Sequence, residues 1–392
     1  MKRLILAAAM AGLLGGCGIL EGDGKPKTPT IGKRIPVLSA ETSIATDPAL
    51  ADVAVTLPPA VANADWAQPG GNAAKSMSQV ALGTSLSRAF AVSIGEGSGN
   101  KARLGAAPVV ADGKIFTVDS GATVSAFDAG TGAQIWKVRP GGPLRGAPTI
   151  ANDNVYVVSQ DNQLFALNPA DGTTRWNEAG TVELAGVFGN ATPAAAQGTV
   201  VAGYSSGELT AYRYENGRTV WQDALARTSI STTVAALSDI DADPVIADGR
   251  VYAVGQGGRM VALELNTGQR IWEINIAGIS TPWVAGEWVF VVTDQGQLLA
   301  LARSSGRIKW MTQLPRWRDD EDKKGRIGWV GPILAGDRLI LVNSLGQIVN
   351  VSPYDGSIQS TVETGMPATL PPVVAGSTLY ILHDSGQLTA WR

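Results

Sequence analysis

Residues 108–136 read PVVADGKIFTVDSGATVSAFDAGTGAQIW. A proline opens a short apolar segment, an Asp-Gly pair follows it, and further apolar segments lead through Thr131-Gly132 to Trp136. Proline has no N–H to donate and therefore suits the first residue of a strand. Asp-Gly and other glycine-containing pairs favour tight turns between antiparallel strands. The stretch therefore predicts four short antiparallel strands joined by turns.

The same pattern recurs along the rest of the chain. Further units begin 38 to 51 residues apart, at Pro148, Pro193, Pro244, Pro282, Pro332 and Pro372. Four-stranded units of about 40 residues are typical of β-propeller blades. A two-sheet sandwich, the other all-β architecture considered, gives no reason for this regular spacing of Pro, Gly and Trp. We therefore predict a single all-β propeller with seven four-stranded antiparallel blades. We also expect packing between blades from a set of repeated tryptophans, Trp136, Trp176, Trp221, Trp272 and Trp310.

The two ends of the repeat region predict how the ring closes. The last unit ends after its third strand, at Arg392, and lacks a fourth. Residues 87–94 (SRAFAVSI) supply a strand of the right type, with Phe90 where the other units place tryptophan. Pairing this N-terminal strand with the last unit would close the ring and remove two free sheet edges.

The N-terminus has the features of a bacterial lipoprotein signal. Lys2 and Arg3 precede an apolar run that ends in Leu14-Gly15-Gly16-Cys17. The run is shorter than the roughly 20 residues that a membrane-spanning helix needs. We therefore expect a signal peptide at 1–16, a flexible tether at 17–63 and a propeller at 64–392. We also expect Cys17 to be lipidated and the lipid to anchor the protein at the periplasmic face of the outer membrane. The tether assignment follows from a composition rich in Pro, Thr, Ala and Lys.

Composition excludes several kinds of function. Lys+Arg 31 against Asp+Glu 34 leaves a formal net charge of -3, which is not the basic footprint of a nucleic-acid-binding protein. Cys17 is the one cysteine and His383 the one histidine. A zinc site, a His-assisted nucleophile and an intramolecular disulfide are therefore not expected. We expect His383 to bond a neighbour or water, and we expect no catalytic residue, no metal and no cofactor.

Two motifs resemble those of a known family. The unit Ala126-Phe127-Asp128 through Thr131-Gly132 to Trp136 resembles the repeat of pyrroloquinoline-quinone dehydrogenases, as does DWAQPGGN at 65–72. Together with the lipoprotein signal, the whole chain looks most like the BamB family of the outer-membrane β-barrel assembly (BAM) complex. The resemblance implies a periplasmic scaffold that binds BamA and other BAM subunits. It also implies eight blades, the eighth of which would have to come from residues 50–86.

The resemblance also points to individual contact residues. Leu237-Ser238-Asp239-Ile240-Asp241 resembles the segment with which the family docks onto BamA, which implies partner contacts by Leu237, Ser238, Asp239 and Asp241. Phe188 stands near the position of an arginine in well-known members, so we expect an apolar contact there. Alternation of Asp239, Asp241 and Asp243 also suggests a calcium loop, but an EF-hand would need Gly and Glu where Pro244 and Arg250 stand. A solvated acidic loop is the remaining alternative.

A dense run of charges forms a second candidate contact. Residues 316–326 mix both signs, which is typical of a solvated interblade loop, and Trp317 and Trp329 flank them. Tryptophan and arginine are enriched in the hot spots of protein interfaces. We therefore expect a solvated loop here, with partner contact as the alternative.

Three functions remain after these exclusions. The first is a non-enzymatic, lipid-anchored BAM subunit that assists folding and insertion of β-barrel proteins, with unfolded outer-membrane proteins as further partners through strand addition. The second is a quinoprotein-like periplasmic dehydrogenase, for which the chain lacks the adjacent cysteine pair of many such enzymes. The third is a propeller lipoprotein that binds a polysaccharide or an unrelated complex.

Overall fold

The structure, a computed structural model, describes residues 44–392 apart from 101, 152, 160–162, 180–190, 205, 214, 217 and 226–239. The described part forms one compact unit, Ile44–Arg392. The predicted signal peptide and Cys17 lie outside it. Within the described residues, no helix is long and apolar enough to cross a membrane.

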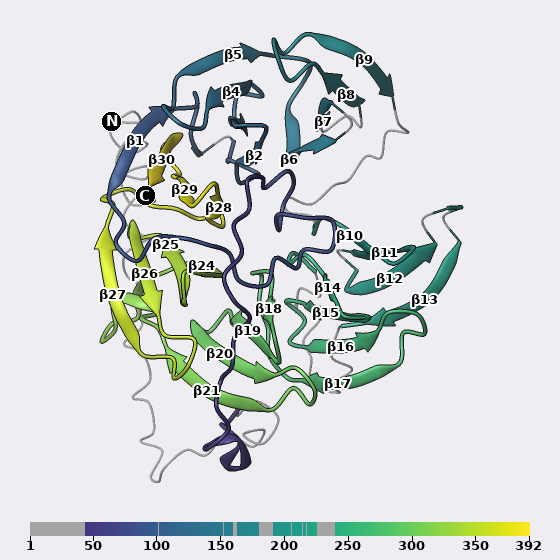
Figure 1. The fold of residues 1–392 in the computed structure, drawn as a ribbon, viewed down its shortest axis with the longest axis vertical. Helices are drawn as coiled ribbons and strands as arrows, with labels where there is room; N and C mark the ends of the chain where they lie inside the picture. Colours follow the sequence, from purple (N-terminus) through teal and green to yellow (C-terminus); the bar gives the residue numbers. More distant parts are fainter. Residues whose placement is uncertain are drawn as a thin grey trace, which may run out of the picture. The chain divides into compact units, whose positions relative to one another are not determined.

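Seven four-stranded antiparallel sheets follow one another around a ring, as the repeats predicted (Figure 1). Blade 1 consists of β2 (Val109–Ala111), β3 (Lys114–Val118), β4 (Val124–Asp128) and β5 (Gln134–Val138). Blade 2 consists of β6 (Leu144–Ala151), β7 (Asn154–Ser159), β8 (Gln163–Leu167) and β9 (Thr174–Ala179). Blade 3 consists of β10 (Ala194–Ala196), β11 (Thr199–Gly203), β12 (Glu208–Arg213) and β13 (Thr219–Ala224). Blade 4 consists of β14 (Val245–Ala247), β15 (Arg250–Val254), β16 (Met260–Glu264) and β17 (Arg270–Ile274).

The remaining blades complete the ring. Blade 5 consists of β18 (Trp283–Ala285), β19 (Trp288–Val292), β20 (Gln297–Ala302) and β21 (Ile308–Gln313). Blade 6 consists of β24 (Trp329–Ala335), β25 (Arg338–Asn343), β26 (Gln347–Val351) and β27 (Ile358–Glu363). Blade 7 consists of β28 (Val373–Ala375), β29 (Thr378–Leu382), β30 (Gln387–Trp391) and β1 (Arg88–Ser93). A two-stranded hairpin of β22 (Trp317–Asp319) and β23 (Lys324–Arg326) lies between blades 5 and 6, and a short 3-10 helix, η1, spans Pro48–Leu50.

Blade 7 confirms the predicted ring closure. Strand β1 pairs antiparallel with β30, with Phe90 opposite Ala390. The described residues give seven blades and not the eight that the resemblance implies. Residues 50–86 hold no strand that could start an eighth blade; their isolated bridges join Trp66 and Val80 to the ring and Val61 to Val80.

Most of the repeated tryptophans pack between blades as expected. Trp136, Trp221, Trp272 and Trp310 are each 7% exposed. Each indole N–H donates to a backbone carbonyl of the following blade, at Pro169, Leu265, Arg303 and Pro353 respectively. Trp176 departs from the prediction, since it is 41% exposed. Its ring contacts that of Tyr156 in its own blade, in a tilted arrangement with centroids 5.8 Å apart. Among the described residues, no buried apolar cluster joins blade 2 to blade 3, so this tryptophan is left partly uncovered.

The ring axis is covered by a segment without strands. Residues 61–83, here called the axial loop, run over the middle of the ring in the dark purple trace of Figure 1. Backbone or side-chain hydrogen bonds join this loop to the innermost strand region of every blade, in ring order, through Asn63 (blade 7), Trp66 (blade 1), Ala67 (blade 2), Ala73 (blade 3), Ala74 (blade 4), Ser78 (blade 5) and Val80 (blade 6). The loop closes on itself where Val61 N donates to Gln79 O and Ala81 N donates to Val61 O.

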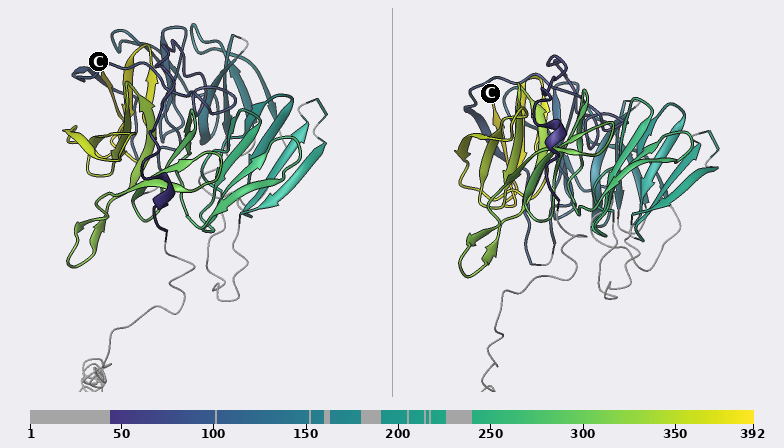
Figure 2. Two further views of the ribbon diagram at one scale, coloured as in Figure 1. Left: turned by 60° about the horizontal axis from the view of Figure 1, so that its bottom comes forward. Right: turned by 90° about the horizontal axis from the view of Figure 1, so that it is seen from below.

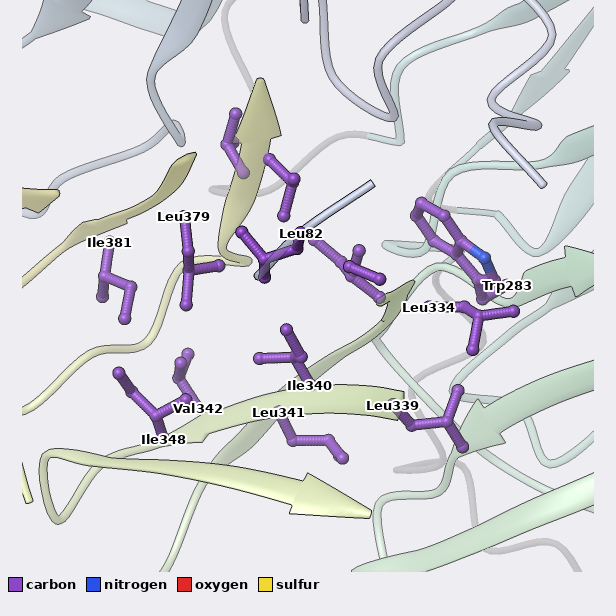
Figure 3. Packing of buried hydrophobic residues seen from close by; sticks show 14 of the residues in the cluster. Leu82, Trp283, Leu334, Leu339, Ile340, Leu341, Val342, Ile348, Leu379 and Ile381 are labelled. Atoms are coloured by element: carbon purple, nitrogen blue, oxygen red, sulfur yellow. The ribbon is translucent and has the colours of Figure 1, made fainter. Parts of the chain in front are cut away.

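The axial loop also contributes to the apolar core. Leu82 lies among apolar side chains of blades 6 and 7, including Ile340 and Leu379, and Trp283 of blade 5 borders the same cluster (Figure 3). Trp66 of the loop stacks on Trp283, with ring centroids 6.2 Å apart. Burial of these groups therefore depends on the loop and the blades together.

Residues 44–53 lie against the outer edge of blade 5. Asp47 N donates to Ile308 O over 2.8 Å, and the Asp47 carboxylate pairs with Arg307 at 3.1 Å. Lys309 Nζ donates to the carbonyls of Leu50 and Ala51, at 2.6 and 2.5 Å. Residues 44–53 belong to the stretch 17–63 that was expected to be a tether, so this part of it contacts blade 5.

Candidate functional site

A cavity of about 270 Å³ lies on the ring axis. Its walls come from the innermost strands of the seven blades or from the segments that lead into them, and its floor comes from the axial loop through Trp66, Pro69, Gly70 and Lys75. Three charged side chains line it, namely Lys75, Asp241 and Asp243. The remaining lining is mostly apolar or small.

The two aspartates come from the segment that leads into β14. The Asp243 carboxylate accepts from Thr192 N over 2.7 Å, and Asp243 N donates to Thr281 Oγ1 over 3.1 Å. Burial raises the pKa of Asp243, and the Lys75 ammonium opposes that rise. Asp241 accepts from the side-chain amide of Gln256. The Asp243 carboxylate is thus held by the segment that leads into blade 3 and the Asp241 carboxylate by blade 4 itself, and both residues line the axial cavity.

Lys75 is the least expected charged residue of the site. Its side chain is 3% exposed, and its ammonium donates to Pro69 O over 2.6 Å. Burial lowers the pKa of Lys75, and the charge of Asp243 opposes that shift. Gly70 has φ +73 and lies against the Lys75 side chain, so that a Cβ on Gly70 would be 2.6 Å from Lys75 Cδ. A glycine is therefore needed at this turn for the lysine to reach the cavity.

The residues assigned to partner contact fall into two groups. Leu237, Ser238, Asp239 and Phe188 lie outside the described residues. Asp241 is described and lines the axial cavity. Ile240 beside it is 1% exposed and packs against Gly203 of blade 3, so the end of this segment is anchored in the ring. Its role in docking remains a prediction.

The charged run forms the hairpin β22–β23, which projects from the ring in Figure 2. Its charged side chains are exposed between 318 and 326. Trp329 is 8% exposed and donates its indole N–H to Pro315 O over 2.8 Å, which fixes the base of the hairpin. Trp317 is half-buried, with the Arg316 guanidinium 5.9 Å from its ring centroid. Of the two flanking tryptophans, Trp329 is therefore buried and Trp317 alone is partly exposed.

His383 is a buried structural residue. It is fully buried, with Nδ1 2.8 Å from Met366 O and Nε2 2.8 Å from Thr389 Oγ1. This confirms the expectation of a histidine bonded to neighbours. Within the described ranges, no group of three or more His, Cys, Asp or Glu side chains is placed to hold a metal ion.

Sequence reasoning missed Lys75 and the whole axial loop. One signal was present, since Gly70-Gly71 in the DWAQPGGN motif marks a tight backbone path. Both glycines have positive φ, +73 and +88, and a Cβ on Gly71 would lie 2.7 Å from the Met77 side chain. The motif is thus explained by the passage of the loop across the axis.

Comparison with known sequences assigns the chain to a family. The sequence model of the family described as outer membrane protein assembly factor BamB matches residues 72–312, more than half of the chain. The chain belongs to the BamB family. The match runs from the axial loop to the outer strand of blade 5 and so includes Lys75, Asp241 and Asp243.

Relatives over most of the chain carry the same family description. The outer membrane protein assembly factor BamB of Salmonella typhimurium is 27% identical over 329 residues, which cover 71% of this chain and 82% of that protein. The BamB of Escherichia coli K12 is 26% identical over 348 residues, covering 76% and 86% respectively.

Solved structures share the propeller fold. BamB from Moraxella catarrhalis superimposes with a TM-score of 0.55 at 19% identity, covering 79% of this chain and 100% of that one. The quinohemoprotein alcohol dehydrogenase of Comamonas testosteroni gives 0.52 at 14% identity, covering 85% and 81%. At these identities the likeness concerns the fold, which BamB proteins and quinoprotein dehydrogenases have in common.

Proposed function

We propose that this BamB-family chain is a lipid-anchored, non-enzymatic scaffold subunit of the outer-membrane β-barrel assembly machinery, and that it acts by binding BamA. The observation that carries the proposal is the family match together with relatives that are named assembly factors over at least 71% of the chain. A closed ring with an axial loop bonded to all seven blades supports a scaffold role, because a rigid frame holds its interblade connections in fixed positions.

The partner face is proposed to be the one from which the hairpin β22–β23 projects (Figure 2). On this face, the interblade connection that carries Asp241 and Asp243 reaches the axial cavity. The opposite face is the one that the axial loop covers, through its bonds to the innermost strands. The docking residues Leu237, Ser238, Asp239, Asp241 and Phe188 belong to two of these connections.

A pull-down with single charge reversals tests the docking proposal. The full-length protein, tagged at its C-terminus, is isolated from membranes in mild detergent beside Asp239→Arg, Asp320→Arg on the hairpin and Glu287→Arg. Glu287 is the control, since its side chain is 76% exposed at the turn that joins β18 to β19. We expect BamA with the wild type, with Asp320→Arg and with the control, and its loss with Asp239→Arg.

The other results have distinct meanings. Loss of BamA with Asp320→Arg would move the contact to the hairpin. Equal loss with all three variants would show a general charge effect and contradict the assigned loop. If the wild type recovers no BamA, the proposed function itself is wrong.

Lipid anchoring at Cys17 and periplasmic exposure at the outer membrane are further parts of the proposal. A Cys17→Ser variant is expected to leave the outer-membrane fraction for the soluble periplasmic fraction, and to lose incorporation of labelled palmitate. Retention of the label in that variant would contradict the assignment. The absence of enzymatic activity is tested with purified protein, in which bound quinone or dye-linked alcohol oxidation would favour the dehydrogenase alternative.

Unfolded outer-membrane proteins are proposed as further partners through strand addition to the outer strands. Three of these strands expose apolar side chains, namely Ile135 on β5, Ile271 on β17 and Ile358 on β27. Backbone hydrogen bonds supply the affinity in this recognition mode. Client peptides with N-methylated backbone amides are expected to bind at least about tenfold more weakly than unmodified ones, and equal binding would rule strand addition out.

A further inference from the structure

One position of the repeat differs between the blades in a way that the strand and turn pattern does not explain. It is the residue directly before the repeat proline, which lines the axial cavity in every blade. In ring order, from blade 1 to blade 7, these residues are Ala107, Ala147, Thr192, Asp243, Thr281, Gly331 and Pro371. A side chain that can accept a hydrogen bond therefore stands at this position in three successive blades, 3, 4 and 5.

Hydrogen bonds join Thr192, Asp243 and Thr281, here called the inner polar row, in ring order. The backbone N–H of Thr192 donates to the Asp243 carboxylate over 2.7 Å. The backbone N–H of Asp243 donates in turn to Thr281 Oγ1 over 3.1 Å. Each bond runs from the backbone of one blade to the side chain of the next, so alanine, glycine or proline at the accepting position could not form it. The row thus joins the connections that lead into blades 3, 4 and 5.

The carboxylate of Asp243 is the costly member of the inner polar row. Burial raises its pKa, which means that the surroundings disfavour its charged form, and the ammonium of Lys75 opposes that rise. Alanine occupies the same position in blades 1 and 2, so the fold of a blade does not require a carboxylate there. A charged group held at this cost indicates a role that alanine would not perform.

The inner polar row lies at the ends of the connections that carry the proposed docking residues. Phe188 stands four residues before Thr192 in the chain, and Asp239 stands four residues before Asp243. The connection into blade 5 carries an apolar side chain, that of Ile279, which is 52% exposed. The two hydrogen bonds of the row therefore fix the ends of three neighbouring connections relative to one another.

We propose that Asp243 is a positioning residue for partner binding, which joins three interblade connections into one docking surface through its bonds to Thr192 and Thr281. This inference rests on the proposed binding of BamA. A partner that contacts more than one connection binds more tightly when the connections are already arranged, because less conformational freedom is lost on binding. The polar side chains then stand in those blades whose connections contribute to docking.

Substitutions within the inner polar row test this inference through the affinity for BamA. Asp243→Ala removes the acceptor for Thr192, and Thr281→Val removes the acceptor for the Asp243 N–H while keeping the shape of the side chain. Asp243→Asn keeps an acceptor and is the conservative variant. Full-length proteins are titrated by microscale thermophoresis against purified BamA in the same detergent. Since hydrogen bonds to charged groups are the stronger ones, we expect binding to weaken at least about tenfold in Asp243→Ala, about threefold or more in Thr281→Val, and less than about threefold in Asp243→Asn.

Asp337→Ala is the control for general destabilisation. The Asp337 carboxylate accepts from the side-chain amide of Gln79 in the axial loop over 2.7 Å, so this variant also removes a carboxylate contact, but at blade 6. We expect it to lower the thermal midpoint and to bind BamA as the wild type does. Equal weakening in Asp337→Ala would show that lost stability alone explains the effect, and would overturn the inference.

The remaining outcomes separate this inference from the proposed function. Binding of BamA by Asp243→Ala as tight as that of the wild type, or binding by Asp243→Asn as weak as that by Asp243→Ala, would overturn the inference and leave the proposed function standing. If Asp243→Ala does not fold, Thr281→Val decides alone, and its unchanged affinity would overturn the inference. A wild-type protein that does not bind BamA would overturn the proposed function itself, and the inference with it.

Discussion

At the scale of single residues, the junctions between blades depend on a glycine that faces an aromatic ring. A Cβ added to Gly172, Gly268, Gly306 or Gly356 would lie 2.5 to 2.6 Å from an atom of the preceding blade's tryptophan or of Thr312 beside it. At the ring closure, Gly132 faces Phe90 in the same way, at 2.6 Å. Phenylalanine has no N–H, and the carbonyl of Ala129 accepts instead from Tyr380 Oη and Arg392 Nη2, at 3.1 and 2.8 Å. At the closure, Tyr380 and Arg392 therefore supply the hydrogen bonds to this carbonyl that a tryptophan supplies at the other junctions.

Replacement of one such glycine tests this contact against a matched control. Gly306 and Gly113 have nearly equal φ, +70 and +68, but a Cβ on Gly306 would lie 2.6 Å from Trp272 Cε3 while one on Gly113 would meet nothing within 4 Å. Gly113→Ala should lower the free energy of unfolding by about 1 kcal/mol through the backbone alone. Gly306→Ala should cost about 2 kcal/mol more, because the tryptophan must move. Urea denaturation measures both, and equal losses would show that the glycine is needed only for its φ.

His383 should make stability depend on pH. Burial lowers its pKa from the ordinary value of 6.5, so the unfolded chain binds the proton more readily than the folded one. The stabilisation is therefore complete above about pH 6.5 and is lost as the pH falls through the folded-state pKa. Between pH 7.5 and 5 we expect the urea midpoint of the wild type to fall more steeply than that of His383→Gln. Parallel slopes would show that other groups cause the acid sensitivity.

At the scale of elements, the sequence predicted the repeated strands and turns of the blades but not the axial loop, which has no repeat. The blade count, the turn positions and the closing strand follow from local spacing, because each blade carries its own Pro, Gly and aromatic signals. Trp176 has the same local pattern as Trp272, yet its burial depends on how closely blades 2 and 3 approach, which no local pattern records. The axial loop is held by partners far away in sequence, such as Val374 for Asn63. Asp241 and Asp243 were found by their alternation, whereas Lys75 became visible only through the fold.

The contact of residues 44–53 with blade 5 gives a prediction at this scale. Lys309→Met removes the donor to the Leu50 and Ala51 carbonyls. Hydrogen bonds to charged donors contribute about 1.5 kcal/mol or more, so local opening of this segment should become roughly tenfold more frequent. Hydrogen exchange of peptides covering 44–53 measures the effect. Lys324→Met on the exposed hairpin is the control, and equally fast exchange in the wild type and Lys309→Met would mean that the segment is not held by Lys309.

At the scale of the whole molecule, one N-terminal stretch completes the ring in three places. Residues 44–53 lie along blade 5, residues 61–83 bond to all seven blades, and β1 supplies the last strand. These contacts join residues hundreds of positions apart, as in the bond from Ser87 N to Arg392 O. Blades 1 to 6 are built from local contacts, and interblade tryptophans join several neighbouring pairs of blades. The N-terminal stretch differs in that it contacts all seven blades.

Two truncations separate these roles. A chain that begins at Asp52 loses the contact with blade 5 but keeps the axial loop, and its thermal midpoint should fall only slightly. A chain that begins at Ser85 keeps β1 but loses Trp66, Val80 and Leu82, which are 3%, 1% and 8% exposed. Each such side chain contributes about 1.5–3 kcal/mol on burial. Their sum approaches the roughly 5–15 kcal/mol of net stability typical of a whole domain.

The chain that begins at Ser85 should therefore fail to show a cooperative transition, or show one at a strongly reduced temperature. A synthetic peptide of residues 54–84, added in trans, should restore it in a concentration-dependent way, because a ligand of the folded state shifts the unfolding equilibrium by mass action. Differential scanning calorimetry measures both effects. An unchanged midpoint in the chain from Ser85 would show that the seven blades close without the axial loop, which would then cover the axis without stabilising the ring.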